Sequence, residues 1–181
     1  MSERHPIRGA QYGGNTSEDA DALEIRLATT ADLEEVMRLA FMAHSDNGFV
    51  DCNAERLINE IYPALVQDHG IFPVIGPPGG DIQGFVLLRI GTMFYSSVPC
   101  LEEKCLWVHP DYRSAKGGRA KKLLDFTKSA ADKLRLPLII GIMTTKRSAG
   151  KVALYTREFG PPAGAFFLYG AECGTHGMEP T

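Results

Sequence analysis

The segment 101–131 constrains the fold most, because a strand, a glycine turn and an amphipathic helix follow one another directly. The predicted strand covers 101–108 and is broken by His109 and Pro110. The adjacent Gly117 and Gly118 free the backbone for a tight turn. The helix after them ends at Pro137, and one of its faces carries Ala120, Leu123, Leu124, Thr127 and Ala131. This unit places the N-terminus of a helix at a glycine turn directly after a strand.

The rest of the chain alternates strand and helix patterns in the order β-α-α-β-β-β-α-β-α-β, without internal repeats. Further strands are predicted at 23–27, 71–75, 82–95, 138–143 and 165–169, and the apolar run 138–143 reads as a strand buried on both sides. Thr29, Thr30 and Asp32 begin a first helix that ends at 46–48. Asn53 caps a second helix, which Pro63 should kink or split before a stop at Gly70. A last helix is predicted at 148–159.

The length and composition are typical of one globular domain. The two ends of the chain lack the hydrophobic periodicity of helices and strands. The 181 residues are 44% apolar and 23% charged. We expect a flexible leader at 1–22, a folded domain at 23–169 and a tail at 170–181.

Charge and cysteine usage exclude several classes. Nineteen basic against 22 acidic residues give a net charge of −3, which disfavours nucleic acid as a partner. The four cysteines have no CxxC spacing, so we expect reduced thiols and no metal site. No apolar run approaches the ~20 residues needed to span a bilayer, and the N-terminus has no secretory h-region. We therefore expect a cytoplasmic protein without membrane contact.

The turn before the third helix has the features of a phosphate site. The first turn of a helix leaves N–H groups unpaired at the positive end of its dipole, where anions bind. Five cations surround the turn, namely Arg113, Lys116, Arg119, Lys121 and Lys122. A solvated basic helix face, or a nucleic-acid contact through 113–122, remains an alternative interpretation. The patterns GxxxxGK[ST] and GxGxxG are absent, which disfavours the corresponding ATP and NAD sites.

Several segments in order resemble the GCN5-related N-acetyltransferases (GNAT). The core motif is Val108-x-Pro110-x-Tyr112-Arg113 followed by the glycine turn and the Ala120-x-x-Leu123-Leu124 helix. Flanking matches are 25–33, Gly84-Phe85-Val86 and Leu154-Tyr155-Thr156-Arg157 near Phe159-Gly160. The resemblance covers about 23–169. The run Lys151-x-x-Leu154-Tyr155-x-Arg157 is similar to phage-associated members.

The resemblance implies an α+β fold, also described as a three-layer α/β fold, with a mixed, mostly antiparallel sheet flanked by helices. Its two central parallel strands, here 101–108 and 138–143, splay apart and hold acetyl-CoA between them. Pantetheine would contact Leu106, Trp107 and Val108, and the CoA pyrophosphate would bind at Arg113, Ser114, Lys116, Gly117, Gly118, Arg119 and Ala120. Lys146, Arg147 or Lys151 would contact the 3′-phosphate. The turn is two residues longer than usual, with Ala115 where the family has Arg or Gln, and little chain remains for a final strand.

The resemblance also implies direct transfer of the acetyl group to a primary amine of a small molecule or a protein. Tyr155 lies where the family has its general acid. The general base is Glu102 or Glu103, which face opposite sides of a regular strand, and the spacing to Val108 favours Glu102. Cys105 reads as a packing residue. A catalytically inactive CoA-binding or interaction module is the alternative function, and a homodimer stays open.

Overall fold

The computed structural model describes residues 23–113, 117–144 and 148–167. The elements in chain order are β1 (Glu24–Leu27), η1 (Thr30–Asp32), α2 (Leu33–Asn47), α3 (Ala54–Leu65), β2 (Gly70–Ile71), β3 (Pro73–Gly76), β4 (Gly84–Thr92), β5 (Pro99–Val108), η2 (Pro110–Tyr112), α4 (Arg119–Leu134), β6 (Leu138–Ile139) and α5 (Ser148–Phe159). The predicted leader and tail lie outside the described residues.

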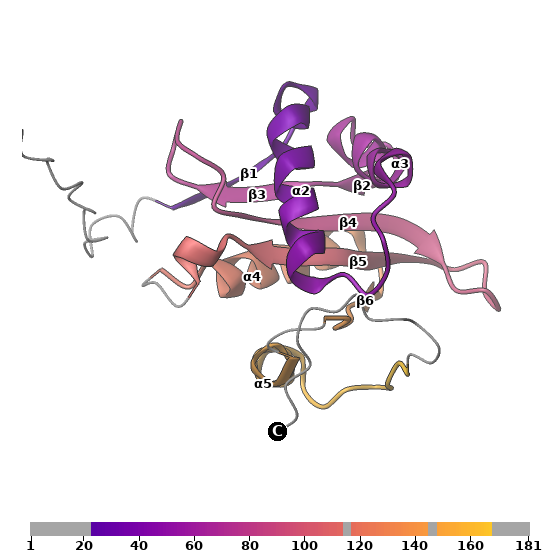
Figure 1. The fold of residues 1–181 in the computed structure, drawn as a ribbon. Helices are drawn as coiled ribbons and strands as arrows, with labels where there is room; N and C mark the ends of the chain where they lie inside the picture. Colours follow the sequence, from indigo (N-terminus) through magenta and orange to yellow (C-terminus); the bar gives the residue numbers. More distant parts are fainter. Residues whose placement is uncertain (1–22, 114–116, 145–147, 168–181) are drawn as a thin grey trace, which may run out of the picture.

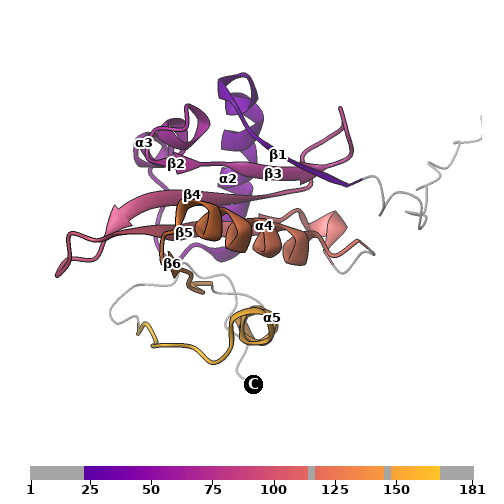
Figure 2. The same ribbon diagram turned by 180° about the vertical axis from the view of Figure 1, so that it is seen from behind.

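One sheet forms the middle layer of the fold, with strand order β1-β3-β4-β5-β6 and with β2 also paired to β4. All pairs are antiparallel except β5 with β6, which is parallel. Helices α2 and α3 cover one face, and α4 covers the other (Figures 1 and 2). Helix α5 lies beyond β6, at that edge of the sheet. This is the predicted α+β architecture with a mostly antiparallel sheet.

Alternating side chains of the central strands build a separate core on each face. Phe85 and Leu87 of β4 pack with α2 and α3, whereas Val86 and Leu88 pack toward α4. All four are buried. Burial of a large apolar side chain stabilises a fold by about 1.5–3 kcal/mol, so these two clusters fix the helices against the strand next to the site.

Local sequence signals account for the helix ends. The backbone N–H of Thr29 donates to the Asp32 carboxylate at 2.8 Å, one half of a capping box. The Asn53 side chain accepts from the Arg56 N–H at 2.9 Å, which confirms the predicted cap of α3. Helix α3 runs through Pro63 without a split and ends before Gly70. Pro63 lies in the last turn of α3, where the helix has almost ended.

Two predicted strands near the C-terminal end are wrong in extent. The pattern at 138–143 predicts a full strand, but β6 contains only Leu138 and Ile139. Of the strand predicted at 165–169, residues 165–167 are described and form no strand, and Phe166 and Phe167 are 79% and 94% exposed. An apolar run does not specify a strand unless a neighbouring edge accepts its hydrogen bonds, and β5 diverges from this segment.

Candidate functional site

The site begins where β5 and β6 stop pairing. Only Leu101 with Leu138 and Glu102 with Ile139 are in register, and beyond them the two parallel strands separate. A cavity of about 440 Å³ lies along the second half of β5. Its lining comes from α2 (Asp46, Asn47), β5 (Leu106, Trp107, Val108), the turn (Tyr112, Arg113, Gly118), α4 (Arg119, Ala120, Lys121) and α5 (Gly150, Lys151, Leu154, Tyr155, Arg157). The size is typical of pockets that bind small molecules.

The glycine turn brings the start of α4 to one end of this cavity. Gly117 and Gly118 have φ of 111° and 56°, and Gly118 is the residue that precedes the helix. The first turn of α4 holds no acidic residue, and its Arg119, Ala120 and Lys121 line the cavity. The positive end of the helix dipole therefore faces the cavity, as an anion site requires. Ser114 and Lys116, also predicted here, lie outside the described residues.

Substitution of Gly118 tests how strongly the turn depends on glycine. An added Cβ has space, since it meets only the Lys121 Cβ at 3.9 Å, but a left-handed backbone penalises any L side chain. We expect Gly118→Ala to lower the free energy of unfolding by about 1–2 kcal/mol in urea denaturation. Gly164→Ala is the control, because Gly164 has no positive φ and its added Cβ meets nothing within 4 Å. Equal losses in both variants would contradict the interpretation.

The cations of the turn have partners within the protein. Arg113 donates through Nε to the Val108 carbonyl at 2.7 Å and pairs with Asp46 at 2.5 Å. Arg119 is buried, donates to Gln83 at 2.6 Å, and has its pKa lowered by burial. Lys121 pairs with Asp125 on the same helix. Arg113, predicted with Lys116 as a phosphate-binding side chain, lines the cavity, and two acceptors also hold its guanidinium against β5 and α2. Its contact with phosphate stays a prediction.

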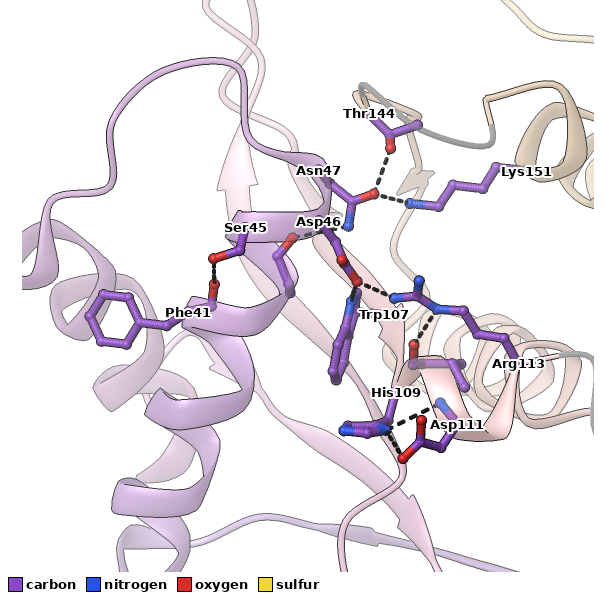
Figure 3. A network of polar contacts seen from close by, with 12 residues as sticks. Phe41, Ser45, Asp46, Asn47, Trp107, His109, Asp111, Arg113, Thr144 and Lys151 are labelled. Carbon is purple, nitrogen blue, oxygen red and sulfur yellow. Dashed lines mark hydrogen bonds and ion pairs between the residues drawn. The ribbon is translucent and has the colours of Figure 1, made fainter. Parts of the chain in front are cut away.

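The C-terminal end of α2 joins the two sides of the cavity (Figure 3). The Asp46 carboxylate accepts from the Trp107 indole N–H of β5 at 3.0 Å and from Arg113 of the turn. The Asn47 side-chain oxygen accepts from the Thr144 hydroxyl at 2.5 Å and from the Lys151 ammonium at 3.2 Å. Asp46 thus reaches β5 and the turn, while Asn47 reaches the segment that leads into α5. These contacts cross the gap where strand pairing has ended.

Removal of the Asp46 carboxylate should be costly. Asp46 and Arg113 are only 27% and 24% exposed, and Trp107 is buried. Asp46→Ala leaves both donors without this acceptor, so we expect the free energy of unfolding to fall by about 2–3 kcal/mol. Asp125→Ala is the matched control, because its partners Lys121 and Lys128 are 53% and 34% exposed and each such surface pair contributes about 0–1 kcal/mol. A loss no larger than that of the control would contradict the prediction.

Tyr155 and Glu103 meet across the gap between α5 and β5. The Tyr155 hydroxyl donates to the Glu103 carboxylate at 2.9 Å. Burial raises the pKa of Glu103 to about 7, although the hydrogen bonds from Tyr155 and the Leu106 N–H and the charge of Lys151 oppose the shift. Burial and the neighbouring carboxylate also raise the pKa of Tyr155. A phenol that stays protonated therefore lies beside a carboxyl group that titrates near neutral pH.

The structure gives Glu102 and Glu103 different partners, although the spacing to Val108 favoured Glu102 as the base. The Glu102 carboxylate binds the Lys104 ammonium at 2.8 Å, and it is Glu103 that contacts Tyr155. The register of β4 and β5 shifts between Leu87 and Leu88, which pair with Cys105 and Glu103, so one extra residue of β5 lies between them. Such a bulge re-aims side chains that regular alternation would place otherwise.

Lys151, predicted as a contact of the CoA 3′-phosphate, lines the cavity four residues before Tyr155. Its ammonium lies against Asn47 and interacts electrostatically with Glu103, and its contact with the 3′-phosphate stays a prediction. Burial and the Glu103 charge raise the pKa of the Cys105 thiol to about 12, so this side chain is a poor nucleophile. Lys146 and Arg147 lie outside the described residues.

Asp46 and Asn47 are the site residues that the sequence did not reveal. Both read as part of the break that ends a helix, and their partners are distant in sequence. Two adjacent polar residues at the end of a helix can cap that helix or contact a distant segment, and the sequence does not indicate which of the two they do.

Comparisons with known proteins agree with this architecture. No family model matches the sequence, and no curated protein matches it. Solved structures do, among them a ribosomal-protein-alanine N-acetyltransferase from Brucella melitensis biovar Abortus 2308, with 19% identity over 82% of this chain and 96% of that one and a TM-score of 0.60. An aminoglycoside acetyltransferase in complex with a CoA-linked bisubstrate analogue has 16% identity over 81% and 96%, with a TM-score of 0.63. A possible acetyltransferase from Clostridium difficile 630 has 14% identity over 82% and 97%, also with a TM-score of 0.63.

The described residues also bear on the predictions about membrane contact and metal binding. None of the described helices is long and apolar enough to cross a membrane. Within the described ranges, no three His, Cys, Asp or Glu side chains are grouped as metal ligands would be. The association with phage stays a prediction. At these identities the structural matches establish the fold, and the chain has the fold of the GNAT acetyltransferases.

Proposed function

We propose that this protein is an N-acetyltransferase that moves the acetyl group of acetyl-CoA to a primary amine. The observation that carries the proposal is that one cavity joins three features: the half of β5 beyond its pairing with β6, the N-terminus of α4 behind Gly118, and Tyr155 on α5. The unpaired half of β5 fits an extended pantetheine, and the N-terminus of α4 fits a diphosphate. Tyr155 fits a departing thiolate.

The residues present suit each proton transfer in this reaction. Direct attack of an amine on a thioester needs a base that takes the ammonium proton and an acid that protonates the thiolate. Glu103, with its pKa near 7, is suited to accept a proton at neutral pH. Tyr155 keeps its proton and is suited to donate it to the thiolate. Glu102, paired with Lys104, is the less suitable base.

The acceptor is proposed only as a class, a small-molecule or protein amine. The structural matches include aminoglycoside acetyltransferases and a ribosomal-protein acetyltransferase, whose names give a small-molecule and a protein acceptor. Together with the resemblance in sequence, the fold supports membership of the GNAT family.

Calorimetry with acetyl-CoA, followed by a panel of amines with thiol detection, tests the proposal. Saturable binding and release of free thiol that depends on an amine are the expected results. Binding without turnover on any amine would favour the inactive CoA-binding module, and absence of binding would overturn both functions.

A further inference from the structure

Lys151 is an amine inside the cavity that the proposed reaction does not use. It lies one helical turn before Tyr155, so both side chains share a face of α5, and both line the cavity. Its Nζ is held 3.2 Å from the Asn47 side-chain oxygen (Figure 3). An acceptor amine in this reaction has to occupy the end of the cavity that Tyr155 lines, and Tyr155 in turn contacts Glu103.

The partner of Lys151 distinguishes it from other lysines of the chain. Lys104, Lys121 and Lys128 each lie within 3.0 Å of a carboxylate oxygen, which stabilises the ammonium form. The hydrogen-bond partner of Lys151 is a neutral amide, which carries no negative charge to hold the ammonium form and accepts a hydrogen bond from an ammonium or from an amine. An acetylated Lys151 would also keep one N–H for this contact.

Burial outweighs the neighbouring charges at Lys151 and favours its neutral amine form. Burial lowers the pKa of Lys151, and Arg113 acts in the same direction. Cys105, Glu103 and Asp46 oppose the shift. A larger fraction of neutral, nucleophilic amine is present at neutral pH than for a lysine in solvent, and Glu103 is close enough to interact with the proton that must leave.

We propose that Lys151 is a site of self-acetylation, an inference that rests on the proposed function. The Lys151 nitrogen attacks the thioester carbonyl carbon of bound acetyl-CoA, a C–N bond forms and the C–S bond breaks. The electron pair of that bond leaves on the CoA thiolate, which takes the Tyr155 proton. The proton displaced from nitrogen passes to Glu103 and from there restores Tyr155. The products are Nε-acetyl-Lys151 and free CoA.

Incubation of the full chain with acetyl-CoA, without any added amine, tests the inference. Mass spectrometry should show one acetyl group per chain, located on Lys151, at a rate independent of protein concentration because the reaction is intramolecular. Lys151→Arg should remove this product. Lys133→Arg, on the exposed last turn of α4, should keep it. Tyr155→Phe should slow it about 10²-fold, which purely chemical acetylation would not show.

The remaining outcomes separate this inference from the function on which it rests. If calorimetry shows acetyl-CoA binding while Lys151 stays unmodified, the self-acetylation is wrong and the acetyltransferase proposal stands. The self-acetylation is equally wrong if acetyl groups spread over surface lysines to the same extent in native and heat-denatured protein. If acetyl-CoA does not bind, both proposals fail. Because Lys151 itself is mapped in the wild-type chain, the result does not depend on the folding of a variant.

Discussion

Replacement of Tyr155 by Phe is expected to lower kcat for acetyl transfer about 10²-fold or more, as loss of a general acid does. The phenyl ring keeps the contact with Phe159, whose ring lies 5.9 Å away, so the change removes only the hydroxyl. The thiolate then leaves without a proton donor at this position. KM for acetyl-CoA should change little, because the predicted binding surface lies along β5 and the turn. Steady-state kinetics with thiol detection measures both constants.

Two comparisons make the Tyr155 result specific. Tyr62→Phe, in α3 and outside the cavity, should leave kcat unchanged, since Tyr62 is 47% exposed. Loss of the hydrogen bond to Glu103 should also cost about 1–2 kcal/mol of folding free energy, which urea denaturation separates from the kinetic effect. Unchanged turnover in Tyr155→Phe would remove this residue from the mechanism.

The parts of the site that short-range patterns encode could be predicted from the sequence. The glycine pair needs a positive φ, and both Gly117 and Gly118 have one. The apolar spacing after them gives α4, and the last helix covers 148–159 as predicted. Tyr155 lines the cavity, and its position on α5 could be predicted because the bounds of that helix could be predicted. Each of these features depends on residues within a few turns of one another.

Features that depend on pairing across the chain could not be predicted in this way. The bulge that turns Glu103 toward Tyr155 is a property of the β4–β5 register. The short β6 reflects the divergence of two strands, which the apolar run 138–143 does not encode. The ion pair of Asp46 with Arg113 joins residues 67 positions apart, so no local pattern indicates it.

Replacement of Glu103 by Gln is expected to lower kcat about 10²- to 10⁴-fold, because an amide cannot take the amine proton. Gln keeps an oxygen that accepts the Tyr155 hydrogen bond. In the wild type, kcat/KM should rise with pH through about 7, the pKa of Glu103. The variant should lose this dependence. Glu102→Gln provides the comparison, and a collapse of activity there with full activity in Glu103→Gln would reverse the assignment of the base.

At high pH the Glu103→Gln variant should be more stable than the wild type. A fall in kcat could then not be explained by unfolding of the variant. The pKa of Glu103 is raised from 4.5 to about 7 by folding, so the folded state binds this proton more tightly than the unfolded state. The contribution of Glu103 to stability is therefore greatest below pH 4.5 and is lost as the pH rises toward 7. The amide of the variant stays neutral at every pH, so Glu103→Gln should exceed the wild type by about 3 kcal/mol at pH 8 but not at pH 4.5. Urea denaturation at both pH values measures the difference, and a variant less stable than the wild type at pH 8 would show that the Glu103 carboxylate is not destabilised by its burial.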